Sequence, residues 1–281
     1  MSTFTEPFYA SSGDPFWVGL VDDAATFPPG DAPLDAALTA YADRAGPAAR
    51  LVRSLVVRDT DLPQVPAGTP VSVVLTGGAG QVHGPAQLCQ RRGLPVAGLE
   101  IALRDVDDPA GNARRVVAAV DAARGEGVLD EDTPVFVELP AVDPAYSWLA
   151  AADEVAAAEL RLKLRTGGLD PDAFPTPERL AAWIDAALDR ELPFKCTAGL
   201  HRALPHVDAD GGAHHGFLTL LAATRVAFDG GSPADVVSTL RRGDATDLLT
   251  LDLAGARRWF TSFGSCSIDE PLADLRELVS L

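Results

Sequence analysis

The chain has 281 residues, enough for one large domain or two small ones with a substantial buried core. Apolar residues make up 47% of the sequence and charged residues 22%, which is the balance of a globular rather than a disordered protein. The net charge of −17 argues against nucleic acids and anionic membranes as partners, because both would repel an acidic protein.

Apolar runs of strand length recur through the first half of the chain, with helical patterns between some of them. The segment that joins the second and third runs is too rich in proline for more than one helical turn. Helices are predicted over 33–46, from Asp108-Pro109 to Gly125, and over 146–158. The predicted strands are 16–22, 53–58, 71–78, 97–103 and 134–140.

The second half continues the alternation of strands and helices. A strand over 160–168, "LRLKLRTGG", is followed by the helix start Thr176-Pro177-Glu178. A last helix begins at Asp269. The other predicted elements are strands at 193–199 and 258–267 and helices at 215–228 and 233–241.

Eight strands that alternate with helices over about 250 residues are typical of a (β/α)8 TIM barrel. We therefore predict one domain over 1–281, with an extended helical insertion at about 200–257 between the seventh and eighth strands. An open, doubly wound α/β sheet is the alternative, because the second connection is short and the seventh is long and irregular. No GxGxxG follows the first strand, which argues against a dinucleotide-binding version.

The cysteines and the N-terminus bear on the cellular compartment. Cys89, Cys196 and Cys266 are scattered singly, which indicates a reduced, cytoplasmic protein without a disulfide framework. The N-terminal "MSTFTEPFYASSGDP" lacks a basic region followed by an apolar core, and no apolar run approaches 18 residues. No signal peptide or membrane span is expected, and the sequence does not indicate the oligomeric state.

Charged residues alternate with apolar ones on four successive predicted strands. In a barrel the outward face of a strand packs against helices and must be apolar, so the charged face points inward, where it is tolerated near the C-terminal mouth. Neighbouring strands would thereby bring two acids and three bases together, a near balance that a low-dielectric interior requires. The side chains predicted to face inward are Glu100, Glu138, Lys163, Arg165, Lys195 and Thr197.

A lysine held among other cations and partly desolvated loses basicity and becomes a nucleophilic amine. Arg165 and Lys195 would act in this way on Lys163, or Lys163 and Arg165 would act on Lys195. Such an amine condenses with a carbonyl compound to form a Schiff base, and Glu100 or Glu138 would then move protons. This predicts a C–C lyase or aldolase acting on a small anionic carbonyl compound.

The two lysine strands resemble a known family of aldolases. Lys163-x-x-Thr166-Gly167, followed by Lys195 and a small-residue run to Gly199, is similar to the lysine strands of deoxyribose-phosphate aldolase. That resemblance implies a (β/α)8 barrel in which Lys163 forms the imine and Lys195 depresses its pKa. Thr166, which lies in this motif, and Thr197, which is predicted to face inward, are candidates for substrate binding.

A second resemblance spans most of the chain. The segments "GLVDDAATFPPG", "KLRTGG", "PFKCTAGLHR", "HHGFLTLLAA" and "FGSCSIDEPLADL" resemble an uncharacterised family of bacterial proteins. This resemblance implies no activity.

Four of the five histidines crowd the loop after the seventh strand, at the predicted mouth. They are His201, His206, His214 and His215. With Asp22 or Glu138 they would suit a metal ion, although their spacing matches no tight motif. A general acid–base role for His201 or His215 is the other interpretation, and incidental histidines in a solvated loop are a third. The primary prediction includes no metal or other cofactor.

Loop residues at the ends of other strands complete the candidate site. Loops after the seventh and eighth strands often bind phosphate in barrels through backbone N–H groups. Cys266 has no evident base beside it and Cys196 faces the helices, so neither is expected to be the nucleophile. The candidates for contacts with the substrate in these loops are Asp22, Gly199, Gly264, Ser265 and His215.

Three functions follow from the sequence. The first is the imine-forming lyase, with a small anionic molecule as its substrate. The second is a metal-dependent barrel enzyme that uses glutamates and histidines. The third is a non-catalytic barrel that binds a ligand, or whose buried charges only hold it together.

Overall fold

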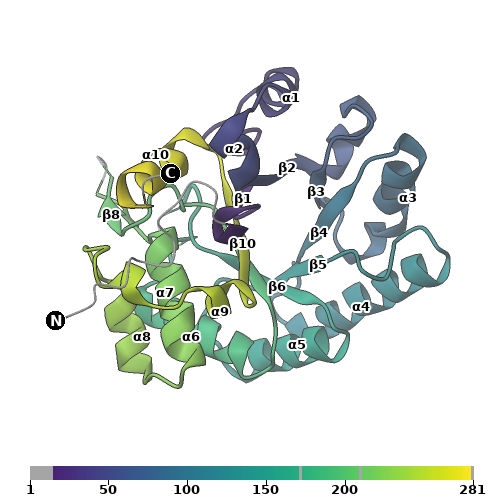
Figure 1. Ribbon diagram of the computed structural model, residues 1–281. Coiled ribbons are helices and arrows are strands. Elements are labelled where there is room, and N and C mark those ends of the chain that lie inside the picture. Colours follow the sequence, from purple (N-terminus) through teal and green to yellow (C-terminus); the bar gives the residue numbers. More distant parts are fainter. Residues whose placement is uncertain (1–14, 171–172, 209–210, 280–281) are drawn as a thin grey trace.

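Eight parallel strands close into a single barrel in the computed structural model, which describes residues 15–170, 173–208 and 211–279. Neighbouring strands follow the chain order, and the last strand pairs with both β7 and β1. The prediction of a (β/α)8 barrel is therefore confirmed against the open sheet (Figure 1). The strands are β1 (Val21–Asp23), β2 (Val52–Arg58), β3 (Val71–Val74), β4 (Val96–Ala102), β5 (Val135–Glu138), β6 (Arg161–Arg165), β7 (Phe194–Thr197) and β10 (Phe260–Ser265).

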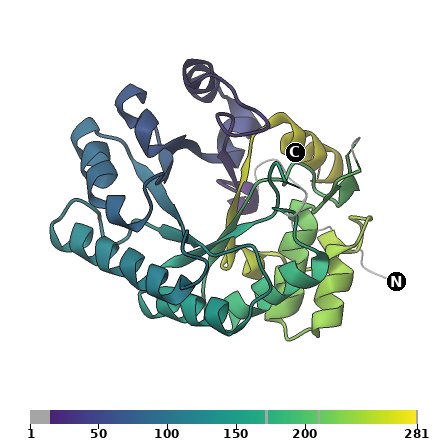
Figure 2. The same ribbon diagram turned by 180° about the vertical axis from the view of Figure 1, so that it is seen from behind.

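Helices surround the barrel on its outer side (Figures 1 and 2). Their starts follow local sequence rules: the side chain of Asp108 accepts a hydrogen bond at the start of α4, and that of Thr176 does so at the start of α6. The helices are α1 (Leu34–Ala42), α2 (Gly46–Leu51), α3 (His83–Arg92), α4 (Pro109–Gly125), α5 (Tyr146–Ala157), α6 (Pro177–Leu188), α7 (Phe217–Phe228), α8 (Pro233–Leu240), α9 (Ala254–Arg257) and α10 (Asp269–Val279). None of the described helices is long and apolar enough to cross a membrane.

The structure differs from the sequence prediction in several connections. The first strand is shorter than predicted, because η1 (Pro15–Trp17) occupies the start of the apolar run. The predictions did not include α2 and α3. The proline-rich second connection forms the short 3-10 helix η2 (Asp59–Gln64). Between β7 and β10 lie the hairpin β8 (His206–Val207) and β9 (Ala213–His214), then α7, α8, η5 (Leu248–Thr250) and α9.

The alternation of side chains in β6 shows how the sequence sorts residues between two environments. Leu162 and Leu164 are buried among the apolar residues that join strands to helices. Lys163, which lies between them, points into the barrel and is also buried. The barrel therefore has an apolar outer layer and a charged interior.

A phenylalanine closes the barrel below these charges. The ring of Phe136 is fully buried, and Lys195 Nζ lies 5.4 Å from its centroid. Gly98 on the neighbouring strand leaves room for the ring, because a Cβ at that position would lie 2.9 Å from a ring carbon. The Phe136 ring is thus an apolar floor under the charged layer.

Candidate functional site

Six charged side chains of alternating sign form one connected series inside the barrel, here named the charge series. Its order is Asp22, Lys195, Glu100, Lys163, Glu138, Arg165. Lys195 Nζ lies 2.6 Å from an oxygen of Asp22 and 2.6 Å from Glu100 Oε1. Lys163 Nζ lies 2.7 Å from Glu100 Oε2 and 3.0 Å from Glu138 Oε2. Arg165 Nε donates to Glu138 Oε1 at 2.8 Å, so three acids balance three bases.

The strand register brings these groups to neighbouring levels of the barrel. Lys163 pairs with Lys195 across β6 and β7, and Glu138 pairs with Lys163 across β5 and β6. The series runs from an enclosed end to an open one. The Lys195 side chain is 1% exposed and that of Lys163 is 7% exposed, whereas that of Arg165 is 39% exposed. The five inward charges predicted from the sequence are therefore brought together.

The neighbouring cations lower the pKa values of the glutamates in the series. Burial alone would raise the pKa of Glu100, but Lys163 and Lys195 outweigh it and lower this pKa to about 2. Burial likewise acts to raise the pKa of Glu138, and Lys163 and Arg165 reverse that effect. Both glutamates are therefore carboxylates at neutral pH.

The expectation that Lys163 has a depressed pKa was wrong. Burial acts to lower the pKa of Lys163, but Glu100 and Glu138 raise it well above its ordinary value. The reason is distance: both glutamates hold its ammonium group within 3.0 Å, and their oxygens separate it from the cations on the neighbouring positions. Without a ligand, the amine of Lys163 carries its proton at neutral pH.

Asp22 is the enclosed end of the charge series. It was expected at the mouth as a contact for a substrate hydroxyl or a metal, but its side chain is fully buried and paired with Lys195. Ser54 Oγ donates to Asp22 at 2.7 Å, and Ser262 Oγ donates at 2.8 Å. Ser54 Oγ also lies 2.8 Å from Ser72 Oγ. These three inward serines were missed. Only Ser72 stands between two apolar residues, whereas Ser54 follows Arg53 and Ser262 follows Thr261, so the alternation that revealed the charges is weaker at these two serines.

The threonine and serine candidates make contacts within the protein. Thr166 Oγ1 donates to the Ala198 carbonyl at 2.6 Å, which ties the end of β6 to the end of β7. Thr197 is partly exposed and pairs with Gly264 across β7 and β10. Ser265 Oγ donates to the Ser267 carbonyl at 2.6 Å and so belongs to the turn before α10.

Gly199 occupies a position that disfavours any side chain. Its φ of +74° lies in the left-handed region, and a Cβ there would lie 2.9 Å from the Thr166 carbonyl oxygen. We expect Gly199→Ala to lower the free energy of unfolding by about 2 kcal/mol in urea titrations, as strain and steric contact combine. Gly230→Ala is the control, because φ there is +82° and no atom lies within 4 Å of the new Cβ. If both variants lost the same free energy of unfolding, steric contact at position 199 would not contribute to the loss.

The four histidines after β7 have separate partners. His214 Nε2 lies 2.9 Å from Asp208 Oδ2, and its ring stacks on that of His206 at 4.8 Å. His215 is buried, and its Nε2 lies 2.8 Å from the Pro175 carbonyl oxygen. Within residues 15–170, 173–208 and 211–279, no three His, Cys, Asp or Glu side chains are grouped as metal ligands. The ligand set that the metal-dependent alternative expected, histidines together with Asp22 or Glu138, is therefore not assembled among the described residues.

His201 faces a cysteine that the sequence prediction had set aside. His201 Nε2 lies 3.7 Å from Cys266 Sγ, and His201 Nδ1 lies 3.0 Å from Glu270 Oε2. The statement that Cys266 lacks a base was therefore wrong. The two residues are 65 positions apart, and only the closure of the barrel brings the loops after β7 and β10 together.

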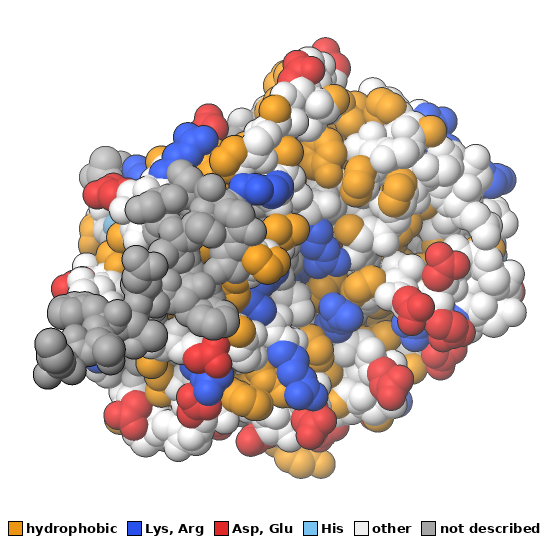
Figure 3. Space-filling view, viewed as in Figure 1, with side chains coloured by type: hydrophobic (Ala, Val, Ile, Leu, Met, Phe, Trp, Pro, Cys, Tyr) orange, Lys and Arg blue, Asp and Glu red, His pale blue; other side chains and the backbone are white. Residues whose placement is uncertain are grey.

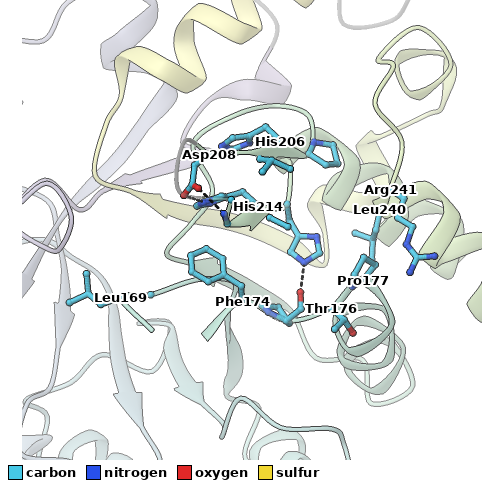
Figure 4. A pocket seen from close by; sticks show the side chains of 17 residues that line it. Leu169, Phe174, Thr176, Pro177, His206, Asp208, His214, Leu240 and Arg241 are labelled. Carbon is cyan, nitrogen blue, oxygen red and sulfur yellow. Dashed lines mark hydrogen bonds and ion pairs between the residues drawn. The ribbon is translucent and has the colours of Figure 1, made fainter. Parts of the chain in front are cut away.

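A cavity of about 820 Å³ lies at the loop that follows β6, the strand that carries Lys163 and Arg165 (Figure 4). It is lined by the loop after β6, the β8–β9 hairpin and the end of α8. The ring of Phe174 meets that of His214 edge-on, with centroids 4.7 Å apart. Arg165 Nη1 donates to the Gly167 carbonyl at 3.4 Å, beside the Gly168 that lines the cavity. Arg165 is not itself a lining residue; it reaches the edge of the cavity through its contact with this loop.

A second group of cations lies at the opposite, N-terminal end of the strands. The guanidinium carbons of Arg53 and Arg161 lie 5.9 and 5.8 Å from the centroid of the Phe136 ring. Burial and the charge of Arg53 lower the pKa of Arg257 to about 10. No described carboxylate forms an ion pair with any of these three arginines. Figure 3 shows basic side chains near the middle of one face and acidic ones toward its edges.

The fold and the site together define a TIM barrel whose buried lysines are salt-bridged inside it. Comparison with models of protein families and with curated proteins found no match to this chain. The function must therefore be inferred from the site itself.

Proposed function

We propose that this barrel is a lyase of the aldolase type, which acts on a small anionic carbonyl compound through an imine at Lys163. The observation that carries the proposal is the use of lysine. The sequence has 23 Lys and Arg residues, of which only Lys163 and Lys195 are lysines, and both are buried in the charge series. Arginine serves salt bridges as well as lysine does, but its guanidinium does not form imines under these conditions.

Exposure favours Lys163 over Lys195 as the nucleophile. Lys195 is enclosed between Asp22, Glu100 and the Phe136 ring. Lys163 lies two positions closer than Lys195 to Arg165, which is the exposed end of the series and contacts the loop that lines the cavity. The resemblance of the two lysine strands to deoxyribose-phosphate aldolase implies the same assignment.

The proposed reaction begins with a proton transfer inside the charge series. The substrate anion pairs with Arg165, and Lys163 Nζ gives one proton to Glu138 or Glu100, its two nearest carboxylates. The free amine attacks the carbonyl carbon, and loss of water leaves an iminium ion. A glutamate then takes the proton of the β-hydroxyl, the C–C bond breaks, the β-carbon leaves as an aldehyde, and the electron pair of the bond moves into the iminium. The glutamic acid protonates the resulting enamine, and water hydrolyses the imine to release the second product and free Lys163.

Borohydride trapping tests this proposal. Incubation with pyruvate or glyceraldehyde 3-phosphate and then borohydride is expected to leave a reduced adduct on the Lys163 peptide, identified by mass spectrometry. Because the pKa of Lys163 is raised, the trapping rate should increase with pH between about 7 and 10 rather than level off near neutrality. Lys163→Arg should abolish the adduct.

The assignment to Lys163 can also fail in two distinct ways. With Lys163 as one of only two lysines, few other amines compete for the label. An adduct confined to Lys195 would reverse the assignment of the two lysines. No adduct on either lysine, with a panel of aldehydes and ketoacids, would remove the imine mechanism.

A non-catalytic charged layer is the second candidate function, and one observation favours it. Every member of the charge series is already paired, and the raised pKa of Lys163 opposes attack by its amine. In this case the barrel would give no trapped adduct with any carbonyl compound. The borohydride experiment therefore separates the two candidates.

A further inference from the structure

Cys266, His201 and Glu270 form an arrangement that is separate from the charge series. Cys266 follows β10, His201 lies in the loop after β7, and Glu270 is in the first turn of α10. The Sγ to Nε2 distance is 3.7 Å, and the Nδ1 to Oε2 distance is 3.0 Å. A thiol, an imidazole and a carboxylate are thus connected in the order that nucleophilic catalysis uses.

His201 and Cys266 are both held by the surrounding structure. Asp274 on α10 accepts from Arg202 at 3.0 Å and from the Ala203 backbone at 2.7 Å, which fixes the loop that carries His201. Gly30, from the loop after β1, packs against Cys266; a Cβ on Gly30 would lie 2.9 Å from that of the cysteine. The arrangement is therefore built from three loops at the C-terminal end of the barrel, where barrel enzymes carry their active sites.

The hydrogen bond to Glu270 determines the role of the ring. When Nδ1 donates to the carboxylate, Nε2 keeps its lone pair and faces the thiol. Burial raises the pKa of Cys266, and the charges of Glu270 and Asp23 act in the same direction. The resting thiol is therefore protonated, and a base must remove its proton during attack.

We propose that Cys266 is a nucleophile for acyl donors, with His201 as its general base and Glu270 as the positioning residue. In the first step Sγ attacks the acyl carbon of an ester or thioester, and Nε2 takes the thiol proton. Nε2 then passes this proton to the leaving alcohol or thiol as the acyl–oxygen or acyl–sulfur bond breaks. Water releases the S-acyl group as a carboxylic acid. None of these steps involves Lys163, so the inference goes beyond the proposed lyase.

The test uses p-nitrophenyl acetate as the probe. Wild-type protein should release p-nitrophenolate with a burst close to one equivalent, and the acetyl group should be found on the Cys266 peptide. Cys266→Ala should lose the burst. His201→Ala should slow acetylation by about 100-fold and change its dependence on pH. Glu270→Gln should slow it by about tenfold and should also change its dependence on pH, which a merely structural role would not do.

Two controls make the test specific. Cys89 and Cys196 are fully buried and should remain unlabelled in the same sample. His83→Ala removes the imidazole of an exposed His–Glu pair, with 2.9 Å between His83 and Glu126, and should leave the rate unchanged. His201→Gln keeps the approximate size of the side chain and should show the same loss as His201→Ala.

Three outcomes would overturn the inference. The first is the absence of acetyl on Cys266. The second is that Cys266 is acetylated at the same rate in the two His201 variants as in the wild type. The third combines two results. Urea unfolding shows that both His201 variants are misfolded, which would explain their slower acetylation, and the correctly folded Glu270→Gln variant is acetylated at the full wild-type rate.

Discussion

Replacement of Glu100 by glutamine is expected to lower the free energy of unfolding by about 3–5 kcal/mol, because it leaves two buried ammonium groups with one carboxylate fewer. Glu100 is 2% exposed and holds Lys163 at 2.7 Å and Lys195 at 2.6 Å. Both lysine side chains are almost completely shielded from solvent, at 7% and 1% exposed. Urea unfolding at pH 7 measures the loss.

The second arm of this experiment adds Lys163→Met. Removal of Glu100 and Lys163 together leaves two intact pairs, Asp22 with Lys195 and Glu138 with Arg165. We therefore expect the double variant to be more stable than the sum of the single losses implies, by about 2–3 kcal/mol. Strict additivity would show that the charges act independently.

An exposed pair provides the matched control for the charge change. Arg114 and Glu154 lie 2.8 Å apart, with side chains 58% and 35% exposed. Glu154→Gln removes the same chemical group as Glu100→Gln but should cost at most about 1 kcal/mol, because solvent screens the pair. A comparable loss at both positions would contradict the role of burial.

Acid is expected to weaken the protein by about 3 kcal/mol through Glu100 alone. The folded-state pKa of this carboxyl group is about 2, whereas the ordinary pKa of a glutamic acid side chain is 4.5. A lowered pKa gives stability that is fully present above pH 4.5 and is lost as the pH falls toward 2. Glu138, whose pKa is also lowered, adds to the loss in the same direction.

Urea unfolding of the wild type and of Glu100→Gln across pH 7 to 2 tests this prediction. The difference in unfolding free energy between the two proteins should shrink as the pH falls through this window, because glutamine does not titrate. Lys163 acts at the other end of the scale. Its raised pKa gives stability that is complete below about pH 10.5 and declines only above it. Parallel curves for the two proteins from pH 4.5 to 2 would contradict the assignment to Glu100.

Much of the barrel and its charged interior was predictable because strands leave a simple alternating pattern. In β6, for example, the alternation places Lys163 in the barrel interior and its neighbours Leu162 and Leu164 against the helices. The pairing of neighbouring strands follows from the chain order. The short α3 was not predicted, because its mean hydropathy is low and its apolar residues are few.

The electrostatics and the loops were less predictable. The sign of the pKa shift at Lys163 depends on which charges lie nearest, and a list of inward residues does not contain distances. The contact of His201 with Cys266 joins two irregular loops, for which no periodic pattern exists. In contrast, the sequence alone shows that the chain has only two lysines, and both lie on predicted strands.

The linear order of the charge series has an evolutionary consequence. Mutation of one member leaves its neighbour as a buried charge without its partner. Joint loss of an adjacent acid and base leaves all remaining charges paired only for particular acid–base couples. Asp22 with Lys195, Glu100 with Lys163, and Glu138 with Arg165 are such couples. Sequence drift in this interior should therefore proceed by compensated exchanges of these couples, and its intermediates would be selected against.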